Sequence, residues 1–418
     1  MANQKHIYVY LDWLELGGLE KLGILQVEQL RGKEVFSFSY NKEWLESGFA
    51  MLLDPDLGLY GGPQYLRDNK PNFGLFMDSA PDRWGRVLMQ RREALNAGNE
   101  NRKVHPLFES DFLLGVYDLY RMGALRFRLT EDGPFLHNEK DMTVPPFTSL
   151  RTLEEASLRL EDTDNLEDPA FAHWLSLLIS PGSSLGGARP KASVKDPEGN
   201  LWIAKFPSRN DDRDIGAWEA VVNELALKAG LLTAEGNANK ISRTFHTFLT
   251  KRFDRVGDKR IHFASAMTLL GYSDGMDAGI GVSYLHLAEF IMRYGAAPER
   301  DLEELWRRIV FYICVSNSDD HLRNHGFLLT AKGWRLSPAF DINPIPRSTG
   351  LTLNISEHSN ILDVDLAREV AGQFRISPER REEIIAAVSG AVSHWRNVAG
   401  GMGIPRREIE DMRDAFKQ

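Results

Sequence analysis

The sequence has a single cysteine among its 418 residues, so the chain cannot form an internal disulfide. That residue, Cys314, lies in the apolar run of residues 309–315. In such surroundings a cysteine packs as a small hydrophobic side chain more often than it acts as a nucleophile. The scarcity of cysteine fits a reducing compartment, and we expect a cytoplasmic protein.

Long apolar runs are also missing. No stretch of eighteen apolar residues occurs, so we expect no membrane-spanning helix. Residues 1–13 lack the basic region, the apolar stretch and the small-residue cleavage site of a secretory signal. We therefore expect neither secretion nor insertion into a membrane.

An excess of positive charge is absent too. The chain has 59 acidic and 50 basic residues and a formal net charge of −9, which would not by itself attract nucleic acid or an anionic membrane. Contact with DNA would need a partner protein. What is present is a large apolar share, 43% of the residues. A chain of this length and composition exceeds one ordinary core, which predicts two or three lobes and a cleft between them.

Residue patterns divide the chain into β-rich and helical parts. Alternating apolar residues predict strands within 6–13 and 34–40, and residues 22–30 predict another strand between them, with a turn at 31–33 before the last strand. A capping side chain and a proline in residues 78–81 predict the start of a helix, and helical spacing dominates after Phe263. We predict a β-rich N-terminal subdomain (1–145), a lobe with a glycine-rich loop and a lysine strand (146–262), and a mostly helical lobe (263–418).

The segment Ser183–Lys191 places adjacent glycines between two predicted strands. Glycines let backbone amides approach phosphate oxygens, and the basic residues of the segment can add positive charge. The spacing does not match a Walker loop. An ordinary glycine turn is the alternative interpretation.

Lys205 follows this loop on a predicted strand. Ile203 and Lys205 point to the same face of a strand, so an apolar patch and a cation could grip one nucleotide. A lysine on an edge strand that points into water is the alternative. Such a lysine needs a carboxylate to hold it, and we choose Glu219 on the next predicted helix, with Glu224 as the competing candidate.

Asp319 and Asn324 stand in the DxxxxN spacing that protein kinases use for a catalytic aspartate and a metal-binding asparagine. Residues 326–340 predict a hairpin with Lys332–Gly333 at its tip. That register places Asn324 opposite Asp341, and a longer turn would shift the pairing by a residue or two.

Two such oxygen ligands suit Mg²⁺, which takes the rest of its shell from water and substrate phosphates. Asp319 then remains to accept the proton of a substrate hydroxyl. A polar loop with helix caps is the plain alternative. A rival metal site would combine Asp319 and Asp320 with His321 and His325, but this needs a helix, and the glycine and strand signals after His325 argue against one.

Several separated segments, in one order, resemble the HipA family of bacterial serine/threonine kinase toxins, and the resemblance covers nearly the whole chain. They are SSLGGARPKA, AKFP, WEAVVNELALKAGL, KRFDR, NSDDHLRNHGF, AFDINP and, earlier, FMDSAPDRWGR and DFLLGVYDLYRMGAL. The resemblance implies an α+β, protein-kinase-like two-lobed fold with a β-rich N-terminal subdomain and an all-helical C-lobe. It also implies a serine/threonine protein kinase that uses ATP and Mg²⁺ and is the toxin of a toxin–antitoxin pair.

Carried over by position, the resemblance assigns a role to individual residues. Asp319 becomes the catalytic aspartate, Asn324 and Asp341 the Mg²⁺ ligands, and Lys205 the phosphate lysine, with Glu219 as its partner. The other nucleotide-binding residues are Gly186, Gly187, Ala188, Arg189, Lys191, Arg252, Phe253 and His321, although bracing of the catalytic loop by His321 stays open.

The family's inhibitory autophosphorylation serine falls on Ser184, with Ser183 as the neighbouring alternative. Phosphate there adds negative charge where ATP places its own, which should oppose nucleotide binding. Lys251 and Pro190 depart from residues common in the family, but neither departure removes a catalytic group.

The resemblance further implies a small helix-turn-helix antitoxin, similar to HipB, that carries the toxin to operator DNA. It implies a protein substrate such as an aminoacyl-tRNA synthetase. Two other functions stay open: a catalytically silent co-repressor subunit that only binds its partner, and a small-molecule kinase. Loss of toxicity with retained partner binding in Asp319→Asn would distinguish the enzyme from the silent subunit.

Overall fold

The structure is a computed structural model that describes residues 4–67, 70–136, 144–162, 169–182, 187–241 and 245–417. The chain separates into two compact units. The first comprises Met1–Asn210 and Asp254–Ala264, and the second comprises Asp211–Phe253 and Ser265–Gln418. The three-part division at residues 145 and 262 stays a prediction.

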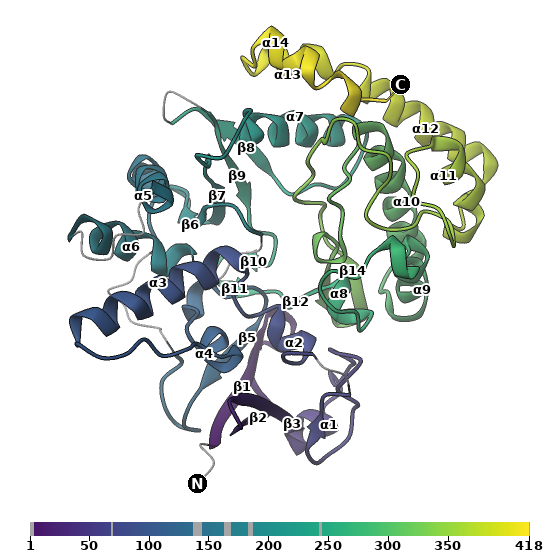
Figure 1. Ribbon diagram of the computed structural model, residues 1–418. Coiled ribbons are helices and arrows are strands. Elements are labelled where there is room, and N and C mark those ends of the chain that lie inside the picture. Colours follow the sequence, from purple (N-terminus) through teal and green to yellow (C-terminus); the bar gives the residue numbers. More distant parts are fainter. Residues whose placement is uncertain are drawn as a thin grey trace. The chain divides into compact units, whose positions relative to one another are not determined.

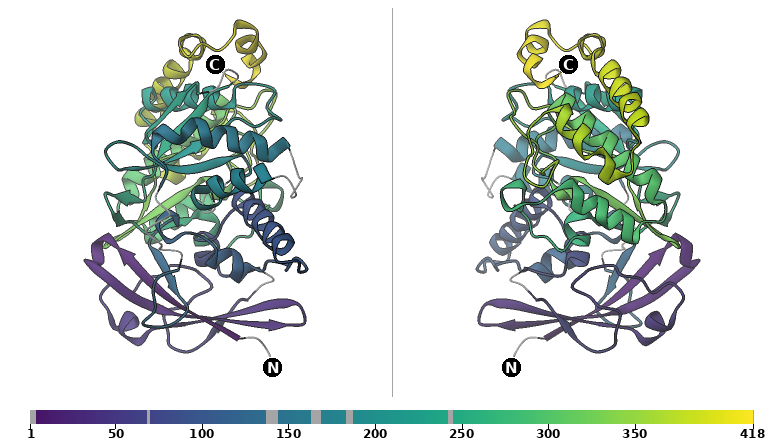
Figure 2. Two further views of the ribbon diagram at one scale, coloured as in Figure 1. Left: turned by 90° about the vertical axis from the view of Figure 1, so that its left-hand side faces the viewer. Right: turned by 90° about the vertical axis from the view of Figure 1, so that its right-hand side faces the viewer.

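The first unit begins with an antiparallel sheet in the order β4-β3-β2-β1-β5 (Figures 1 and 2). Its strands are β1 (Gln4–Trp13), β2 (Gly18–Leu30), β3 (Lys33–Tyr40), β4 (Gln64–Tyr65) and β5 (Leu125–Arg128). In β1 the alternate residues Ile7, Val9 and Leu11 are fully buried, which is the period of a strand with one face on a core. Arg31 and Gly32 form the predicted turn, and both have positive φ as a two-residue hairpin turn requires.

The helices of the first unit are inserted between the strands of this sheet or follow β5 in the sequence. They are η1 (Leu14–Leu16), α1 (Lys42–Glu46), α2 (Gly74–Met77), α3 (Arg83–Asn99), α4 (Glu109–Leu114), η2 (Asp118–Tyr120), η3 (Phe147–Ser149), α5 (Leu150–Asp162) and α6 (Pro169–Gly182). The capping residue predicted within 78–80 is instead Asp82, whose side chain accepts a hydrogen bond from Gly85 N at 3.2 Å. Pro81 explains the shift, because the residue before a proline is disfavoured in helical geometry.

The strands β6 (Lys191–Lys195) and β7 (Leu201–Lys205) pair antiparallel in the first unit. Asp196 stabilises the turn between them, since its carboxylate accepts from Asn200 N at 2.7 Å and from Trp202 Nε1 at 2.8 Å. The predicted strand, turn and strand are therefore confirmed. The glycine-rich loop precedes β6, but its residues 183–186 lie outside the described residues.

The chain returns to the first unit at the KRFDR segment. Asp254, 1% exposed, accepts a hydrogen bond from Gly123 N at 2.8 Å and another from Arg255 at 2.6 Å. Gly123 has φ +71 and lies so close to Phe263 that a β-carbon would be 3.0 Å from its backbone nitrogen. Asp254 thus links two segments that lie 131 residues apart in the sequence. Three short strands follow: β10 (Arg255–Val256), β11 (Lys259–Arg260) and β12 (Phe263–Ser265).

The second unit is mostly helical, as predicted, and also contains the predicted hairpin (Figure 1). Its strands are β8 (Gly236–Asn239), β9 (Thr247–Lys251), β13 (Gly326–Thr330) and β14 (Gly333–Leu336). Its helices are α7 (Ile215–Lys228), α8 (Ala266–Leu269), η4 (Ala278–Ile280), α9 (Tyr284–Tyr294), α10 (Pro298–Val315), η5 (Leu322–Asn324), α11 (Val364–Val370), η6 (Ala371–Phe374), α12 (Pro378–Val392), α13 (Trp395–Gly401), α14 (Arg406–Asp411) and η7 (Arg413–Ala415).

Helix α10 forms the centre of this unit. Leu302, Leu305, Trp306 and Ile309 are fully buried at helical spacing, which explains why the sequence forms a helix here. Cys314 near its end is 2% exposed, and burial raises the pKa of its thiol to about 12. The prediction of a packed, unreactive cysteine is confirmed.

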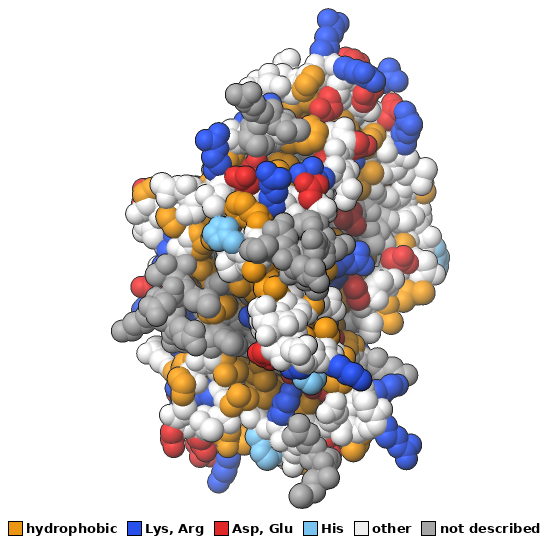
Figure 3. All heavy atoms as spheres, turned by 60° about the vertical axis from the view of Figure 1, so that its left-hand side comes forward, with side chains coloured by type: hydrophobic (Ala, Val, Ile, Leu, Met, Phe, Trp, Pro, Cys, Tyr) orange, Lys and Arg blue, Asp and Glu red, His pale blue; other side chains and the backbone are white. Residues whose placement is uncertain are grey.

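Surface charge is mixed, in keeping with the small net charge. In Figure 3, acidic and basic side chains are interspersed on the face in view, without a broad area of one sign. Among the described residues, no helix has both the length and the apolar character needed to cross a membrane.

Candidate active site

The candidate catalytic loop, residues 317–325, begins where α10 ends. Ser316 ends the helix in the left-handed conformation with φ +51, and Asn317 N donates to Tyr312 O at 3.0 Å. Asn317 is 1% exposed, and its side-chain oxygen accepts from Asn343 N at 3.0 Å. This hydrogen bond ties the catalytic loop to the segment that contains Asp341.

Asp320 anchors the loop in the protein interior. Its carboxylate accepts a hydrogen bond from the Tyr284 hydroxyl and lies 2.9 Å from His325 Nε2. Asp320 and His325 are at most 1% exposed, and burial followed by the charge of Asp320 raises the pKa of Tyr284 well above its usual value. Because buried charge is costly unless it is paired, these partners fix the loop strongly.

The same contacts argue against the rival site of histidines and aspartates. His325 is occupied by Asp320, and residues 322–324 form one turn of 3₁₀ helix instead of an α-helix that would align His321 with His325. Within the described part of the chain, no group of three or more His, Cys, Asp or Glu side chains could hold a metal ion.

Asp319 differs from its neighbour because it is exposed. Loss of hydration raises the pKa of its carboxyl most, His321 opposes the rise, and the negative charges of Asp341 and Asp320 add to it. Asn324 Nδ2 donates to Asp319 O at 2.9 Å, so the asparagine is held beside the aspartate. The structure therefore brings Asp319, Asn324 and Asp341 together.

Asp341 itself has φ +57, a left-handed conformation that few residues other than glycine, asparagine and aspartate adopt readily. The segment around it is held on both sides. Ala339 exchanges backbone hydrogen bonds with Leu232 and Ala234 at 2.8 and 2.9 Å, and Asn343 Nδ2 lies 3.4 Å from Asp341 Oδ1. Strained backbone held by its surroundings is common at functional sites.

The predicted register of the hairpin was wrong, because the tip lies one residue earlier in the sequence than predicted. Thr330 pairs with Gly333, so Ala331 and Lys332 form the tip, and Asn324 does not lie opposite Asp341 in the ladder. The cause is local, because Thr330 Oγ1 donates to Gly333 O at 2.8 Å and accepts from Lys332 N at 3.3 Å. Gly333 with φ +125 is a strand residue packed on Tyr294, where a β-carbon would be 2.6 Å from a carbonyl oxygen.

The residues at this site fit a magnesium ion. Asp319 and Asp341 offer carboxylates whose mutual repulsion a cation would relieve, and Asn324 adds a neutral oxygen, a hard donor set that Mg²⁺ prefers. Asn343 Oδ1 is also buried and has no hydrogen-bond partner among the described residues. Sequence reasoning gave Asn343 no role, although it lies in the AFDINP segment.

Glu219 lines a small pocket together with Asp341. The pocket walls also include residues of α7, of the loop that follows it, of β9 and of the segment after Ala339, namely Asn223, Ala234, Phe248, Thr250, Phe340 and Ile342. Glu219 is 5% exposed, whereas the side chain of the competing Glu224 is 43% exposed and paired with Lys228 at 2.6 Å. The choice of Glu219 over Glu224 is favoured, but its pairing with Lys205 stays a prediction.

The candidate phosphate-binding residues belong to the first unit. Lys191 and Lys205 are direct cross-strand partners of β6 and β7. Lys191 is 3% exposed and lies 3.6 Å from Asp82, whereas Gly187 and Ala188 are exposed. The other expected residues of this loop, Ser183, Ser184 and Gly186, lie outside the described residues.

Three other predicted nucleotide-binding residues lie in the second unit. Arg252 is 4% exposed, and the Phe253 ring packs against Phe340 with centroids 5.5 Å apart. Phe340 directly precedes Asp341, so Phe253 of the KRFDR segment contacts the segment that contains Asp341. His321 precedes η5, and its Nδ1 is buried without a hydrogen-bond partner in the described part of the chain.

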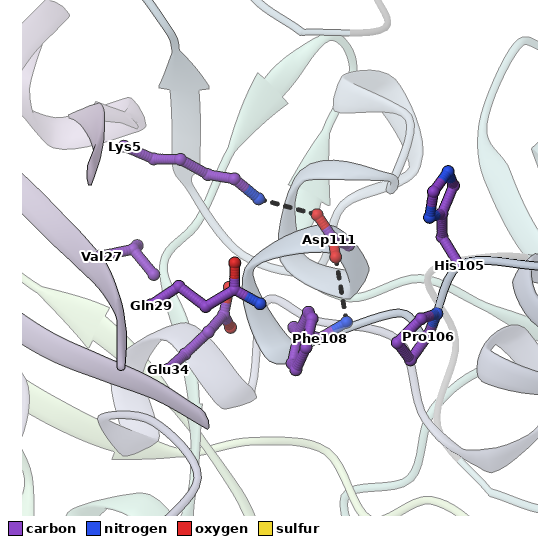
Figure 4. Close-up of a pocket in the computed structure, with 8 residues that line it drawn as sticks. All are labelled: Lys5, Val27, Gln29, Glu34, His105, Pro106, Phe108 and Asp111. Atoms are coloured by element: carbon purple, nitrogen blue, oxygen red, sulfur yellow. Dashed lines mark hydrogen bonds and ion pairs between the residues drawn. The ribbon is translucent and has the colours of Figure 1, made fainter. Parts of the chain in front are cut away.

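A separate cavity of about 330 Å³ lies in the first unit (Figure 4). Lys5 points across it and donates to Asp111 at 2.9 Å, and Asp111 accepts from Phe108 N at 3.0 Å. Glu34 is bonded to Ser110. Since Lys5 is paired with Asp111 and the Glu34 carboxylate is bonded to Ser110, we assign no transfer chemistry to this cavity.

Comparison with known proteins identifies the family. The family model of the HipA-like C-terminal domain matches residues 183–395, just over half of the chain and the whole of the candidate catalytic loop. The chain belongs to the HipA-like family. The match includes the glycine-rich loop, Lys205, Glu219, Asp319, Asn324 and Asp341.

A solved structure of the HipA, HipB and operator DNA complex from Shewanella oneidensis MR-1 shares the fold. Its matching chain has a TM-score of 0.64 and 16% identity, with 98% of this chain and 94% of that chain covered. The predicted fold class, an α+β protein-kinase-like two-lobed fold of the HipA type, is confirmed. The proinflammatory kinase CtkA of Helicobacter pylori matches over 53% of this chain and 95% of its own at 16% identity, and its TM-score is only 0.37.

A curated relative from Haemophilus influenzae has a name that provisionally assigns it to the kinases. It is 26% identical over 196 residues, which is 41% of this chain. The chain spans little more than half, 56%, of the length of that relative.

Proposed function

We propose that this HipA-like protein is a cytoplasmic serine/threonine protein kinase that transfers the γ-phosphoryl group of ATP to a protein hydroxyl. The arrangement of the two aspartates in the catalytic loop is the observation that carries the proposal. Asp320 is buried and bonded, whereas Asp319 is exposed beside Asp341. Phosphoryl transfer depends on such positioning and on neutralised charge more than on covalent chemistry.

Asp319 would orient the substrate hydroxyl and accept its proton. The raised pKa of its carboxyl makes it a better base than an ordinary aspartate, because a stronger conjugate base takes the proton more readily. Asn324 and Asp341 would hold Mg²⁺, which when bound neutralises charge on the phosphates. Lys205 would bind the phosphates and be held by Glu219.

Ser184 or Ser183 would be the site of autophosphorylation, in the loop before β6. A phosphate on either hydroxyl would add close to two negative charges beside the nucleotide site and oppose ATP binding. The protein would thereby limit its own activity.

A small DNA-binding antitoxin of the HipB type is the proposed partner. The Shewanella protein with the same fold was solved with HipB and operator DNA. The formal charge of −9 supports an indirect role at DNA, because the chain would not attract nucleic acid by itself. The substrate would be a protein of translation such as an aminoacyl-tRNA synthetase.

Peptide mass spectrometry after incubation with Mg²⁺ and ATP tests the proposal. The unmodified chain should gain a phosphate on Ser183 or Ser184, and Asp319→Asn should gain none. Asp411→Asn is a matched control, because Asp411 is an exposed aspartate on α14, away from the catalytic loop in the sequence.

The outcome also separates the alternatives. A chain that binds ATP, starts unphosphorylated and gains no phosphate would contradict a self-modifying kinase and favour the silent subunit or a small-molecule kinase. Equal labelling of Asp319→Asn and the unmodified chain would remove Asp319 from its catalytic role.

A further inference from the structure

We propose that Asp82, at the start of α3, is a positioning residue for ATP binding that acts by holding Lys191 beneath the glycine loop. The inference rests on the proposed kinase function. The PDRWGR segment of the N-terminal region would then contribute to nucleotide binding, although it contains none of the expected catalytic groups.

Two residues at the start of α3 contact Lys191, one at its side chain and one at its backbone. Asp82 caps the helix with one carboxylate oxygen, and its other oxygen lies 3.6 Å from Lys191 Nζ. Trp84 Nε1 in the same turn donates to the Lys191 carbonyl oxygen at 3.1 Å. The side chains of Asp82 and Lys191 are 8% and 4% exposed, so water screens their attraction little.

Lys191 needs a nearby negative charge because of its partner across the strands. Lys191 and Lys205 are directly opposite in β6 and β7, and opposite residues of an antiparallel pair project from the same face. Two like charges in this arrangement repel each other. Asp82 offsets the charge of Lys191 and so reduces this repulsion.

Gly187, the first described residue of the glycine loop, lies against this ammonium group. Gly187 has φ +91, and a β-carbon on it would lie only 2.6 Å from Lys191 Nζ. The position of Nζ therefore sets how the loop backbone lies at Gly187. Because backbone amides of such a loop bind phosphate, a displaced Lys191 would alter the phosphate site through the backbone at Gly187.

Removal of the Asp82 charge has two opposite effects. A negative charge lost near the phosphates would strengthen ATP binding, whereas the loss of a counter-ion from the buried Lys191 ammonium would favour a shift of its side chain. The second effect should dominate, because removing a counter-ion from a buried charge costs more than relieving a longer-range repulsion in a more hydrated site. We therefore expect weaker binding of ATP.

The test is the ATP dependence of autophosphorylation in the full chain with Asp82→Asn. Asparagine caps a helix as well as aspartate does, so this variant removes the charge and keeps α3 capped. The KM for ATP should rise about tenfold with kcat changed less than about twofold. Asp363→Asn is the matched control, because Asp363 caps α11 through Asp365 N at 2.9 Å.

A double variant shows whether Asp82 acts through Lys191. If it does, Asp82→Asn should add nothing to the rise in KM caused by Lys191→Met. Multiplying effects in the double variant, or an unchanged or lower KM in Asp82→Asn alone, would overturn the inference. An unmodified chain that neither binds ATP nor gains phosphate would instead overturn the proposed kinase function and this inference with it.

Discussion

Asp319 and Lys191, two residues with proposed roles, are held in different ways. The candidate catalytic loop is anchored within its own unit, where Asp320 is bonded to Tyr284 and His325. Lys191 at the start of β6 is instead contacted by α3, whose Trp84 lies 107 residues earlier in the sequence. The proposed role of Asp319 should therefore tolerate changes in the N-terminal region, whereas nucleotide binding should not.

Asp319→Asn should have the largest effect on activity, a loss of about 10³-fold in phosphoryl transfer, because the base is removed. The fold should not suffer. Since its surroundings raise the pKa of Asp319, the ionised form costs stability above that pKa, and the variant should melt at the same or a slightly higher temperature. Intact mass against time and a thermal scan measure both effects, and a destabilised variant would contradict the repulsion from Asp341.

Asp320→Ala should act mainly on stability, in contrast to Asp319→Asn. It leaves Tyr284 and His325 buried without their shared acceptor, which should lower the free energy of unfolding by about 3 kcal/mol. Urea denaturation measures this loss. Asp411→Ala, on the exposed surface of α14, should change it little, and equal effects of the two variants would show that Asp320 is no anchor.

Acid should destabilise the first unit through His262. Burial lowers the pKa of His262 to about 4, so the folded chain keeps it neutral while the unfolded chain binds a proton below its ordinary pKa of 6.5. Stability should fall by about 3 kcal/mol as the pH drops from about 6.5 to 4. The free energy of unfolding of His262→Gln should lack this part of the pH dependence. If it fell as steeply with pH in the variant as in the unmodified chain, the role of His262 would be contradicted.

Gly333→Ala tests the observed hairpin register with a smaller effect. A β-carbon there would clash with Tyr294 O, and the φ of +125 disfavours alanine, so unfolding should become easier by about 2 kcal/mol. Gly390→Ala is the control, because Gly390 lies in α12 with nothing near its β-carbon position and should gain about 0.5–1 kcal/mol. A tolerated Gly333→Ala would favour the register with Lys332–Gly333 at the tip.

Local patterns were sufficient to predict much of the fold. Alternation identified β1 and β3, and apolar residues at helical spacing identified α10. The turn at Arg31 and Gly32 was also predictable, because a charged residue and glycine between alternating strands favour a tight turn. The spacing of Asp319 and Asn324 selected the loop whose residues the structure brings beside Asp341.

Contacts between distant segments were not predictable from the same patterns. Nothing near Asp320 shows that Tyr284, 36 residues earlier, will bond it, and nothing near Lys191 points to Asp82. The hairpin register failed for a different reason. A threonine hydroxyl stabilises the turn at Ala331–Lys332, whereas the Lys-Gly pair alone suggested a tip one residue later.

Calorimetric titration with ATP and Mg²⁺ of Asp319→Asn and Asp341→Asn tests the central claim most directly. Asparagine adopts the left-handed conformation of residue 341 readily, so the second variant should keep its backbone. We predict that Asp319→Asn binds the magnesium nucleotide within about threefold of the unmodified Kd, whereas Asp341→Asn binds about tenfold or more weakly and loses its dependence on Mg²⁺. Unchanged, Mg²⁺-dependent binding by Asp341→Asn would contradict the assignment of the metal site and the division of roles between the two aspartates.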